Sequence, residues 1–175
     1  ADSIRRAAGT LSRHKAITTA PRLAVVLEGF EAAGFAQAAV EGLVLGAHKF
    51  LDYKTGEAAR DTNKLKEIEF IVTGKAVLAK VSKEIERGRT IAEGQLLVRR
   101  LSATPSNDLT PRLYATRIAN LAKEHGLQCQ VLDEKAIAKE KMGGLLGVSK
   151  GSEEPPRFVV LKYQKSSAKT KPIVL

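Results

Sequence analysis

Three features of this 175-residue sequence predict an α/β fold with parallel or mixed sheets and flanking helices in a three-layer arrangement. Segments with apolar residues three and four positions apart, as on one face of a helix, alternate with short apolar runs of strand length. One such run, Leu23–Leu27 (LAVVL), is β-branched at its centre and follows Pro21, which predicts a strand buried on both faces of a parallel sheet. The composition, 43% hydrophobic and 27% charged, is typical of soluble globular proteins and argues against a disordered chain.

The predicted helices and strands alternate along the chain. Helices are expected at 3–15, 31–50, 76–101 and 111–125, and a short helix is expected after Asp133 that ends near Met142. Strands are expected at 23–27, 68–72, 127–132 and 157–163, and a further strand begins at 172–175. Residues 51–65 are polar, contain Gly56 and Asn63, and predict a surface loop.

Capping residues and apolar spacing predict the first two helices. Ser3 can cap the first helix, whose apolar stripe comprises Ile4, Ala7, Ala8 and Leu11. The second helix has its own stripe, formed by Ala36, Val40, Leu43, Ala47 and Phe50. Gly42 and Gly46 lie one turn apart on this second helix, where they are expected to permit close packing.

The third helix is the longest predicted element. Its buried side is marked by Leu78, Val81, Ile85, Ala92 and Leu96. Gly88 and Gly94 each weaken a helix by about 1 kcal/mol relative to Ala, so a kinked or split helix is the expectation.

A boundary between two structural units is predicted at 102–111 (SATPSNDLTP), because its two prolines disfavour helix in the residues before them. Thr110 is a suitable N-cap for the next helix, and Pro111 suits its first position, where no N–H is needed. Gly126 is expected to stop this helix after His125.

The net charge of +10 suggests an anionic partner. The basic excess is spread almost evenly, however, and no block of five like charges occurs. A nucleic-acid-binding arm usually concentrates its charge. Two interpretations therefore remain: an evenly basic, solvated surface, and a nucleic-acid-binding surface.

Other features bear on the compartment. No apolar run approaches the ~18–20 residues that span a bilayer, and the first residues, 1–6, do not resemble a signal peptide. Cys129 is the only cysteine, which excludes an intrachain disulfide; it is predicted to be buried and inert in its strand. A cytoplasmic, reducing location without membrane contact is the expectation.

The sequence predicts no catalytic, cofactor-binding or metal-ligating residue. The three histidines, His14, His48 and His125, lack the spacing of a helix-borne zinc site, and a structural role at a helix end is favoured for His125. Carboxylate pairs occur at Glu67/Glu69, Glu84/Glu86 and Glu153/Glu154, where charged surface is the favoured interpretation. Gly143, Gly144 and Gly147 follow a predicted helix, so packing and turn roles are favoured over a phosphate site.

Several motifs together resemble one family. SATPSNDLTP (102–111) resembles the start of the catalytic domain of the leucyl aminopeptidase (cytosol aminopeptidase) family. Three further stretches are similar to that family in the same order, namely VLDE (131–134), KMGGLLGVSKGS (141–152) and PPRFVVLKY (155–163). Upstream, EGLVLGAHKFLDYKT (41–55) is similar to its N-terminal domain. Ala103 and Ser106 depart from the family's usual Asn and Pro, in a loop away from the metal ligands.

The resemblance implies a dimetal exopeptidase that releases N-terminal residues from peptides, with two divalent ions (Zn or Mn) and a hexameric assembly in the parent enzyme. It implies that the family's metal-ligand segment follows a strand resembling 171–175, so the present chain would be an inactive internal fragment that binds no metal pair. The expected organisation is a partial N-terminal α/β domain at 1–74, a connecting helix and boundary loop at 75–108, and the first part of a catalytic α/β domain at 109–175. A nucleic-acid-binding or an oligomer-assembly module remains the alternative.

Overall fold

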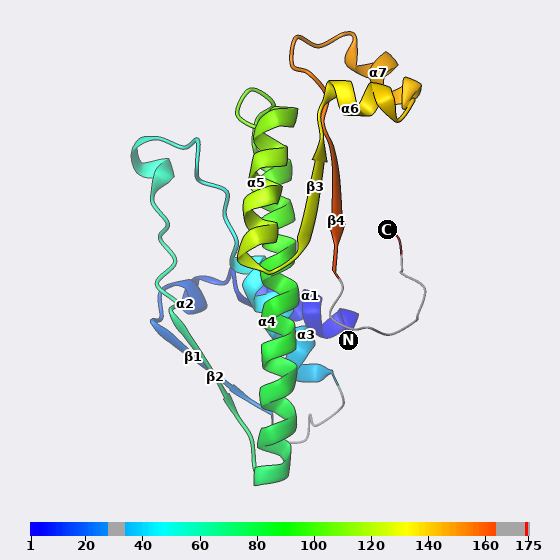
Figure 1. Cartoon of the computed structure of the whole chain (residues 1–175). Helices are drawn as coiled ribbons and strands as arrows, with labels where there is room; N and C mark the ends of the chain where they lie inside the picture. Colours follow the sequence, from blue (N-terminus) through cyan, green and yellow to red (C-terminus); the bar gives the residue numbers. More distant parts are fainter. Residues whose placement is uncertain (28–33, 164–173, 175) are drawn as a thin grey trace. The chain divides into compact units, whose positions relative to one another are not determined.

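The computed structural model describes residues 1–27, 34–163 and 174. The chain divides into two compact units, 1–103 and 104–175. The first contains α1 (Asp2–Leu11), α2 (Lys15–Thr18), β1 (Arg22–Val26), α3 (Phe35–Ala47), a short 3₁₀ helix (Gly56–Ala59), β2 (Glu67–Ile71) and α4 (Lys75–Ala103) (Figure 1). The second contains α5 (Pro111–Glu124), β3 (Gln128–Leu132), α6 (Glu134–Lys139), α7 (Gly143–Ser149) and β4 (Phe158–Lys162). The predicted α/β class is confirmed.

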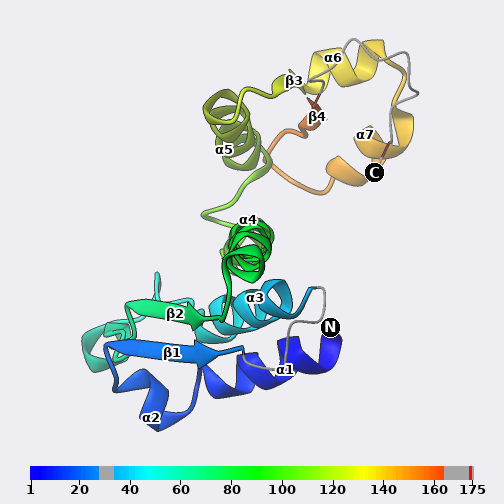
Figure 2. The same cartoon turned by 90° about the horizontal axis from the view of Figure 1, so that it is seen from below.

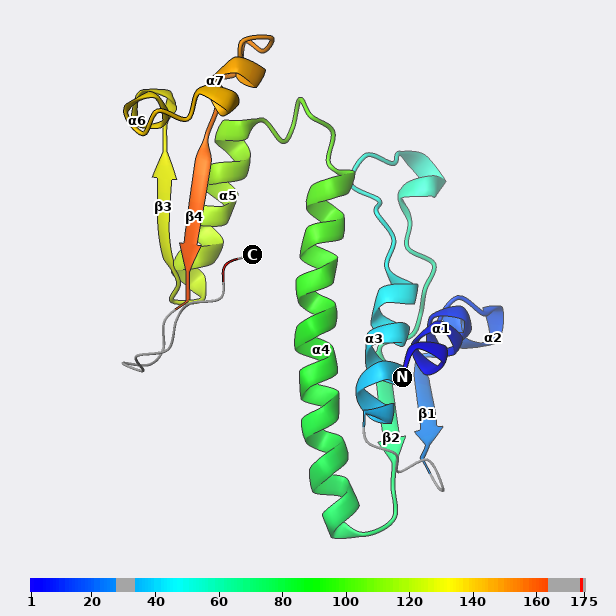
Figure 3. The same ribbon diagram turned by 90° about the vertical axis from the view of Figure 1, so that its right-hand side faces the viewer.

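The first unit is organised around α3. This helix lies between α1 and α4 (Figures 2 and 3), and most of its side chains are buried. Beside it, β1 and β2 pair in parallel, with Val25 opposite Phe70. The inner face of this sheet packs on α3 and α4 around Leu27, Ala36 and Val81. An all-round apolar helix needs cover on every side, and α1, α4 and the sheet supply it.

Glycines set how closely these helices approach. A Cβ at Gly42 would overlap the backbone oxygen of Arg5 and lie 2.7 Å from the Cβ of Ala8. A Cβ at Gly46 would lie 2.5 Å from the backbone oxygen of Gly9. The close packing predicted for these two glycines is therefore confirmed, and the neighbour is α1.

The predicted kink or break in the long helix is wrong, because α4 runs without interruption from Lys75 to Ala103. Gly88 is buried against α3, where a Cβ would lie 2.7 Å from the backbone oxygen of Gln37. The helix thus loses some intrinsic propensity at Gly88 and gains close contact with α3. Gly94 is exposed and has nothing within 4 Å of its Cβ position.

Several other predictions of local structure need correction. Ser3 does not cap the first helix, because α1 begins at Asp2 and has no side-chain N-cap, and α3 ends at Ala47 rather than at Phe50. The first predicted helix ends at Leu11 rather than Lys15, and a separate turn, α2, begins after the extended backbone of His14. The prediction that β1 is buried on both faces is wrong: its residues are alternately exposed and half-buried, and Val26 is 58% exposed, because the two-stranded sheet is packed on one face only. Gly143, Gly144 and Gly147 lie in the helix α7 instead of forming a turn, and none has an atom within 4 Å of its Cβ position, so the predicted packing role is wrong as well.

The second unit places α5 beside an antiparallel pair of strands, in which Gln130 lies opposite Val160. Capping signals in its sequence are confirmed: the Thr110 hydroxyl accepts a hydrogen bond from the Leu113 N–H, and Asp133 accepts one from the Ala136 N–H. Gly126 (φ 65°) ends α5 in a Schellman arrangement. The strand predicted at 172–175 lies outside the described residues, apart from Val174, and so does the predicted helix start at Glu31.

We expect Gly42→Ala to lower the free energy of unfolding by about 2 kcal/mol, because the new methyl group must displace the backbone of α1. Urea unfolding followed by circular dichroism measures the effect. Gly94→Ala is the matched control on an exposed helix position, where the gain in helix propensity predicts stabilisation by about 0.5–1 kcal/mol. Equal effects of the two substitutions would show that the contact between α1 and α3 is not tight.

Candidate functional site

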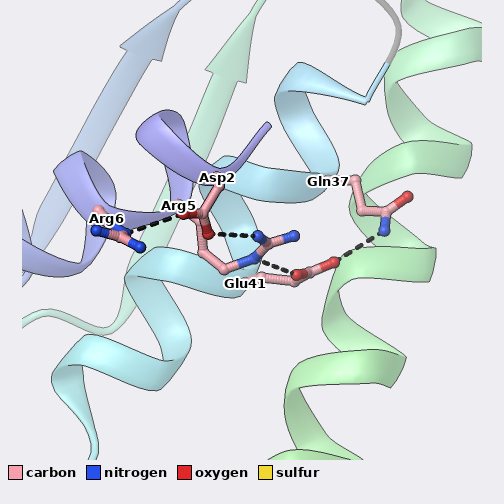
Figure 4. A network of polar contacts seen from close by, with 5 residues as sticks. All are labelled: Asp2, Arg5, Arg6, Gln37 and Glu41. Atoms are coloured by element: carbon pink, nitrogen blue, oxygen red, sulfur yellow. Dashed lines mark hydrogen bonds and ion pairs between the residues drawn. The ribbon is translucent and has the colours of Figure 1, made fainter.

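The buried charged side chain of the described residues is the carboxylate of Glu41, in the middle of α3. Its side chain is 3% exposed and accepts two hydrogen bonds, from Arg5 Nε of α1 at 2.6 Å and from Gln37 Nε2 at 2.8 Å (Figure 4). A carboxylate removed from water is tolerated when it is paired and hydrogen-bonded. The ion pair therefore joins α1 to α3 and provides the buried carboxylate with a charged hydrogen-bond donor.

The outer part of this network is exposed to solvent. Asp2 contacts Arg5 at 3.3 Å and Arg6 at 2.9 Å, both within the first turns of α1. Exposed ion pairs of this kind contribute little stability. Hydrogen bonding to Glu41 raises the pKa of the Arg5 guanidinium above its ordinary value, so Arg5 stays charged. The network is consequently a structural ion pair with a solvated rim.

Side chains of α4 satisfy both ends of α3. Gly34 precedes α3 with a left-handed backbone (φ 80°) and offers no side-chain cap, and its N–H donates to Glu84 Oε1 at 2.9 Å. At the other end, Arg99 Nη1 donates to the Leu45 carbonyl at 2.9 Å. An anion is thus placed at the positive end of the α3 dipole and a cation at the negative end. These two contacts set the register of α4 on α3.

A second polar contact organises the loop after α3. Asp61 accepts hydrogen bonds from the Asn63 N–H at 3.0 Å and from Lys49 Nζ at 3.1 Å. These interactions, led by the backbone N–H of Asn63, lower the pKa of Asp61 below its ordinary value. The contact orders an exposed loop.

The histidines singled out from the sequence lie at helix ends. His14 caps α2, and its Nδ1 accepts a hydrogen bond from the Ala16 N–H at 3.3 Å. His48 follows α3, and His125 is the C-cap of α5, as its position in the sequence predicted. None of the three belongs to a group of three or more His, Cys, Asp or Glu side chains in the described residues that could hold a metal ion.

The predicted carboxylate pairs also serve separate purposes. Glu67 forms a 2.9 Å ion pair with Arg22 across β1 and β2, and Glu84 caps α3, whereas Glu69 and Glu86 are exposed. Cys129 is half-buried rather than fully buried, because the strand pair leaves its side chain partly accessible. In the described ranges, no three His, Cys, Asp or Glu side chains are grouped so as to hold a metal ion.

Sequence reasoning missed Glu41 and Arg5. The signal was present, since Glu41 is the single charged residue in the apolar segment 35–47. A charged residue within an apolar helix requires a partner from another element. Identifying that partner requires the tertiary structure, because Arg5 lies 36 residues away in the sequence.

An apolar hollow of about 620 Å³ lies next to this network, between α1, β1 and α3. Its lining is apolar except for Ser3 and includes Ile4, Ala7 and Leu11 from α1, Leu23 to Val26 from β1, and Leu43 from α3. No titratable side chain lines it. The hollow can therefore receive apolar groups but has no group for acid–base or nucleophilic chemistry.

Comparison with protein families identifies what this arrangement belongs to. The N-terminal domain model of the cytosol aminopeptidase family matches residues 1–57, and the catalytic domain model of the same family matches residues 96–175. The chain belongs to the cytosol aminopeptidase family. The family resemblance drawn from the sequence motifs is confirmed.

Curated relatives support the assignment across most of the chain. A probable cytosol aminopeptidase of Solibacter usitatus is 39% identical over 165 residues, covering 94% of this chain and 33% of the relative. Another, of Streptomyces coelicolor, is 39% identical over 180 residues, covering 96% of this chain and 34% of the relative. The chain thus spans about a third of the length of the relatives it matches. These matches favour the peptidase interpretation over the nucleic-acid-binding alternative.

Solved structures share the fold. The bottromycin maturation enzyme BotP in complex with Mn is 30% identical with a TM-score of 0.77, and the match covers 93% of this chain and 33% of BotP. A tomato leucine aminopeptidase mutant gives a TM-score of 0.83 at 20% identity, covering 97% of this chain and 34% of the mutant, which shows the fold alone. Within the described ranges, no helix is long and apolar enough to cross a membrane.

We expect Glu84→Ala to lower the free energy of unfolding by about 1–2 kcal/mol, because the α3 N-terminus loses its acceptor. Glu86→Ala is the matched control, since Glu86 is an exposed carboxylate on the same helix. Urea unfolding of both variants checks the difference. Identical stabilities would mean that the carboxylate of Glu84 does not cap α3.

We expect the carboxyl of Asp61 to titrate below the ordinary Asp value of about 3.9 and to move towards it in Lys49→Met. A pKa lowered in the folded state gives stability that is present above the ordinary pKa and is lost as the pH falls through the folded value. Carbon-13 NMR titration of the carboxyl measures both values. An ordinary pKa in the unsubstituted chain would contradict the hydrogen-bonded loop.

Proposed function

We propose that this chain is a segment of a dimetal aminopeptidase that releases N-terminal residues from peptides. The observation that carries the proposal is the ordered match of both domain models of one family, at 1–57 and at 96–175. The family is one of aminopeptidases, which are hydrolases, and the curated relatives bear that name. The domain organisation proposed for the segment is 1–74, 75–108 and 109–175.

We propose two divalent ions, zinc or manganese, as the cofactors of the complete enzyme. The Mn complex of the BotP relative is consistent with such a requirement. Divalent ions of this kind activate a water molecule and polarise a carbonyl in metal-assisted hydrolysis. The polar contacts in the described part of the chain connect α1, α3 and α4. In that same part, no three His, Cys, Asp or Glu side chains are grouped so as to hold a metal ion. A cytoplasmic location and a homo-oligomer, a hexamer in the complete enzyme, complete the proposal.

We expect the 175-residue chain alone to be inactive, because it spans about a third of the relatives' length and its described residues include no metal-binding cluster. The measurement is release of leucine from leucine amide, with added Mn²⁺ or Zn²⁺. A full-length cytosol aminopeptidase assayed in parallel is the positive control. Metal-dependent turnover above the blank by the chain alone would contradict the proposed inactivity.

A companion measurement separates the inactivity of the segment from the family function. Isothermal titration with Mn²⁺ alone tests whether the chain binds the ion without turnover. Absence of both binding and turnover is the expected result. Binding at two sites without turnover would show that the metal ligands are present and that other parts of the enzyme are missing.

A further inference from the structure

Helix α1 is attached to the first unit mainly through α3. Among the described elements, it packs extensively on α3, and its apolar residues border the hollow that lies between α1, β1 and α3. Ile4, Ala7 and Leu11 line this hollow, and Leu11 is 55% exposed. The helix therefore has less support than α3, which is covered by α1, α4 and the sheet.

The contact between α1 and α3 is made by small residues. Ala8 is the one buried hydrophobic residue of α1, and it faces Gly42. Gly9 faces Gly46, so neither side contributes a large apolar group there. Close approach without large side chains removes little apolar area from water, and stabilisation by the hydrophobic effect scales with that area.

Because the apolar contact between α1 and α3 is small, the Arg5–Glu41 ion pair makes a large contribution to the stability of α1 on α3. The buried Ser12 hydroxyl does not add a link to α3, since it donates to the Gly9 carbonyl of α1 itself at 2.9 Å. The Arg5–Glu41 contact at 2.6 Å crosses between the two helices. Removing Arg5 would leave Glu41 buried with Gln37 as its remaining partner, which favours any state in which water reaches the carboxylate.

We propose that α1 opens from α3 as a local unit while the rest of the first unit stays folded, and that the Arg5–Glu41 ion pair controls this opening. Opening hydrates the Glu41 carboxylate and removes the α1 wall of the hollow. Apolar side chains of α3 and β1, such as Leu43 and Val25, then become accessible. The first unit thus has a closed state and an open state that differ in exposed apolar surface.

Native-state hydrogen exchange of the 175-residue chain, followed by NMR at increasing sub-denaturing urea, tests the proposal. Local opening predicts that the amides of α1 exchange at least about tenfold faster than the interior amides of α3 and α4, with little dependence on urea. The same rate and the same urea dependence in α1, α3 and α4 would overturn the proposal, because α1 would then open only in global unfolding.

Variants test the role of the ion pair. Arg5→Met is expected to raise the exchange rates of α1 amides about tenfold or more. Arg6→Met is the matched control, because Arg6 is 83% exposed and pairs with Asp2 alone in this network; its α1 exchange rates should change less than about twofold. Equal rates in the two variants would overturn the proposed control by Arg5.

A double variant guards against a general loss of structure. Arg5→Met combined with Glu41→Met replaces both charges by apolar side chains of similar length, so the α1 exchange rates should return towards those of the unsubstituted chain. Binding of the dye ANS should rise in Arg5→Met and fall again in the double variant, because the dye reports exposed apolar surface. A double variant with faster α1 exchange than Arg5→Met would contradict the ion-pair explanation.

Discussion

The buried carboxylate of Glu41 is the constraint on which the placement of α1 in the first unit depends. Helix α3 is apolar on all sides and must be covered by α1, α4 and the sheet, yet it carries one charge at its centre. That charge can be buried only if α1 presents Arg5 at one position, within hydrogen-bonding distance of Glu41. Gly42, next to Glu41, lets the α1 backbone come close enough for this to happen. Charge and glycine together fix where α1 lies.

The contact between α3 and α4 depends on side chains of α4 that bind the backbone at the two ends of α3. The two helices run in the same direction: Glu84, in the first half of α4, contacts the start of α3, and Arg99, near the end of α4, contacts the end of α3. Both side chains have the charge that complements the partial charge at the α3 terminus they contact. Between these two contacts, Gly88 allows the backbones of α3 and α4 to approach closely. A helix with a weak amphipathic pattern can thus be held in one register by two polar contacts and one glycine.

The polar contacts of the described residues form part of the framework of this member of an aminopeptidase family. The polar side chains that are buried or paired here are used to connect helices and strands. The family models match on both sides of the boundary at 102–111, so the framework extends over parts of two domains. Among the residues that the structure describes, no three His, Cys, Asp or Glu side chains are grouped so as to hold a metal ion.

The sequence alone determined the class of the fold, the approximate position of most helices and strands, the helix caps at Thr110 and Asp133, the stop at Gly126 and the family. These properties are local, or are carried by the order of motifs, so neighbouring residues suffice to specify them. Only the tertiary structure decided that Glu41 pairs with Arg5, that Gly88 serves packing in an unbroken α4, and that β1 is covered on one face. Each of these depends on residues distant in the sequence, and local propensity carries no information about which distant backbone or charge will lie alongside.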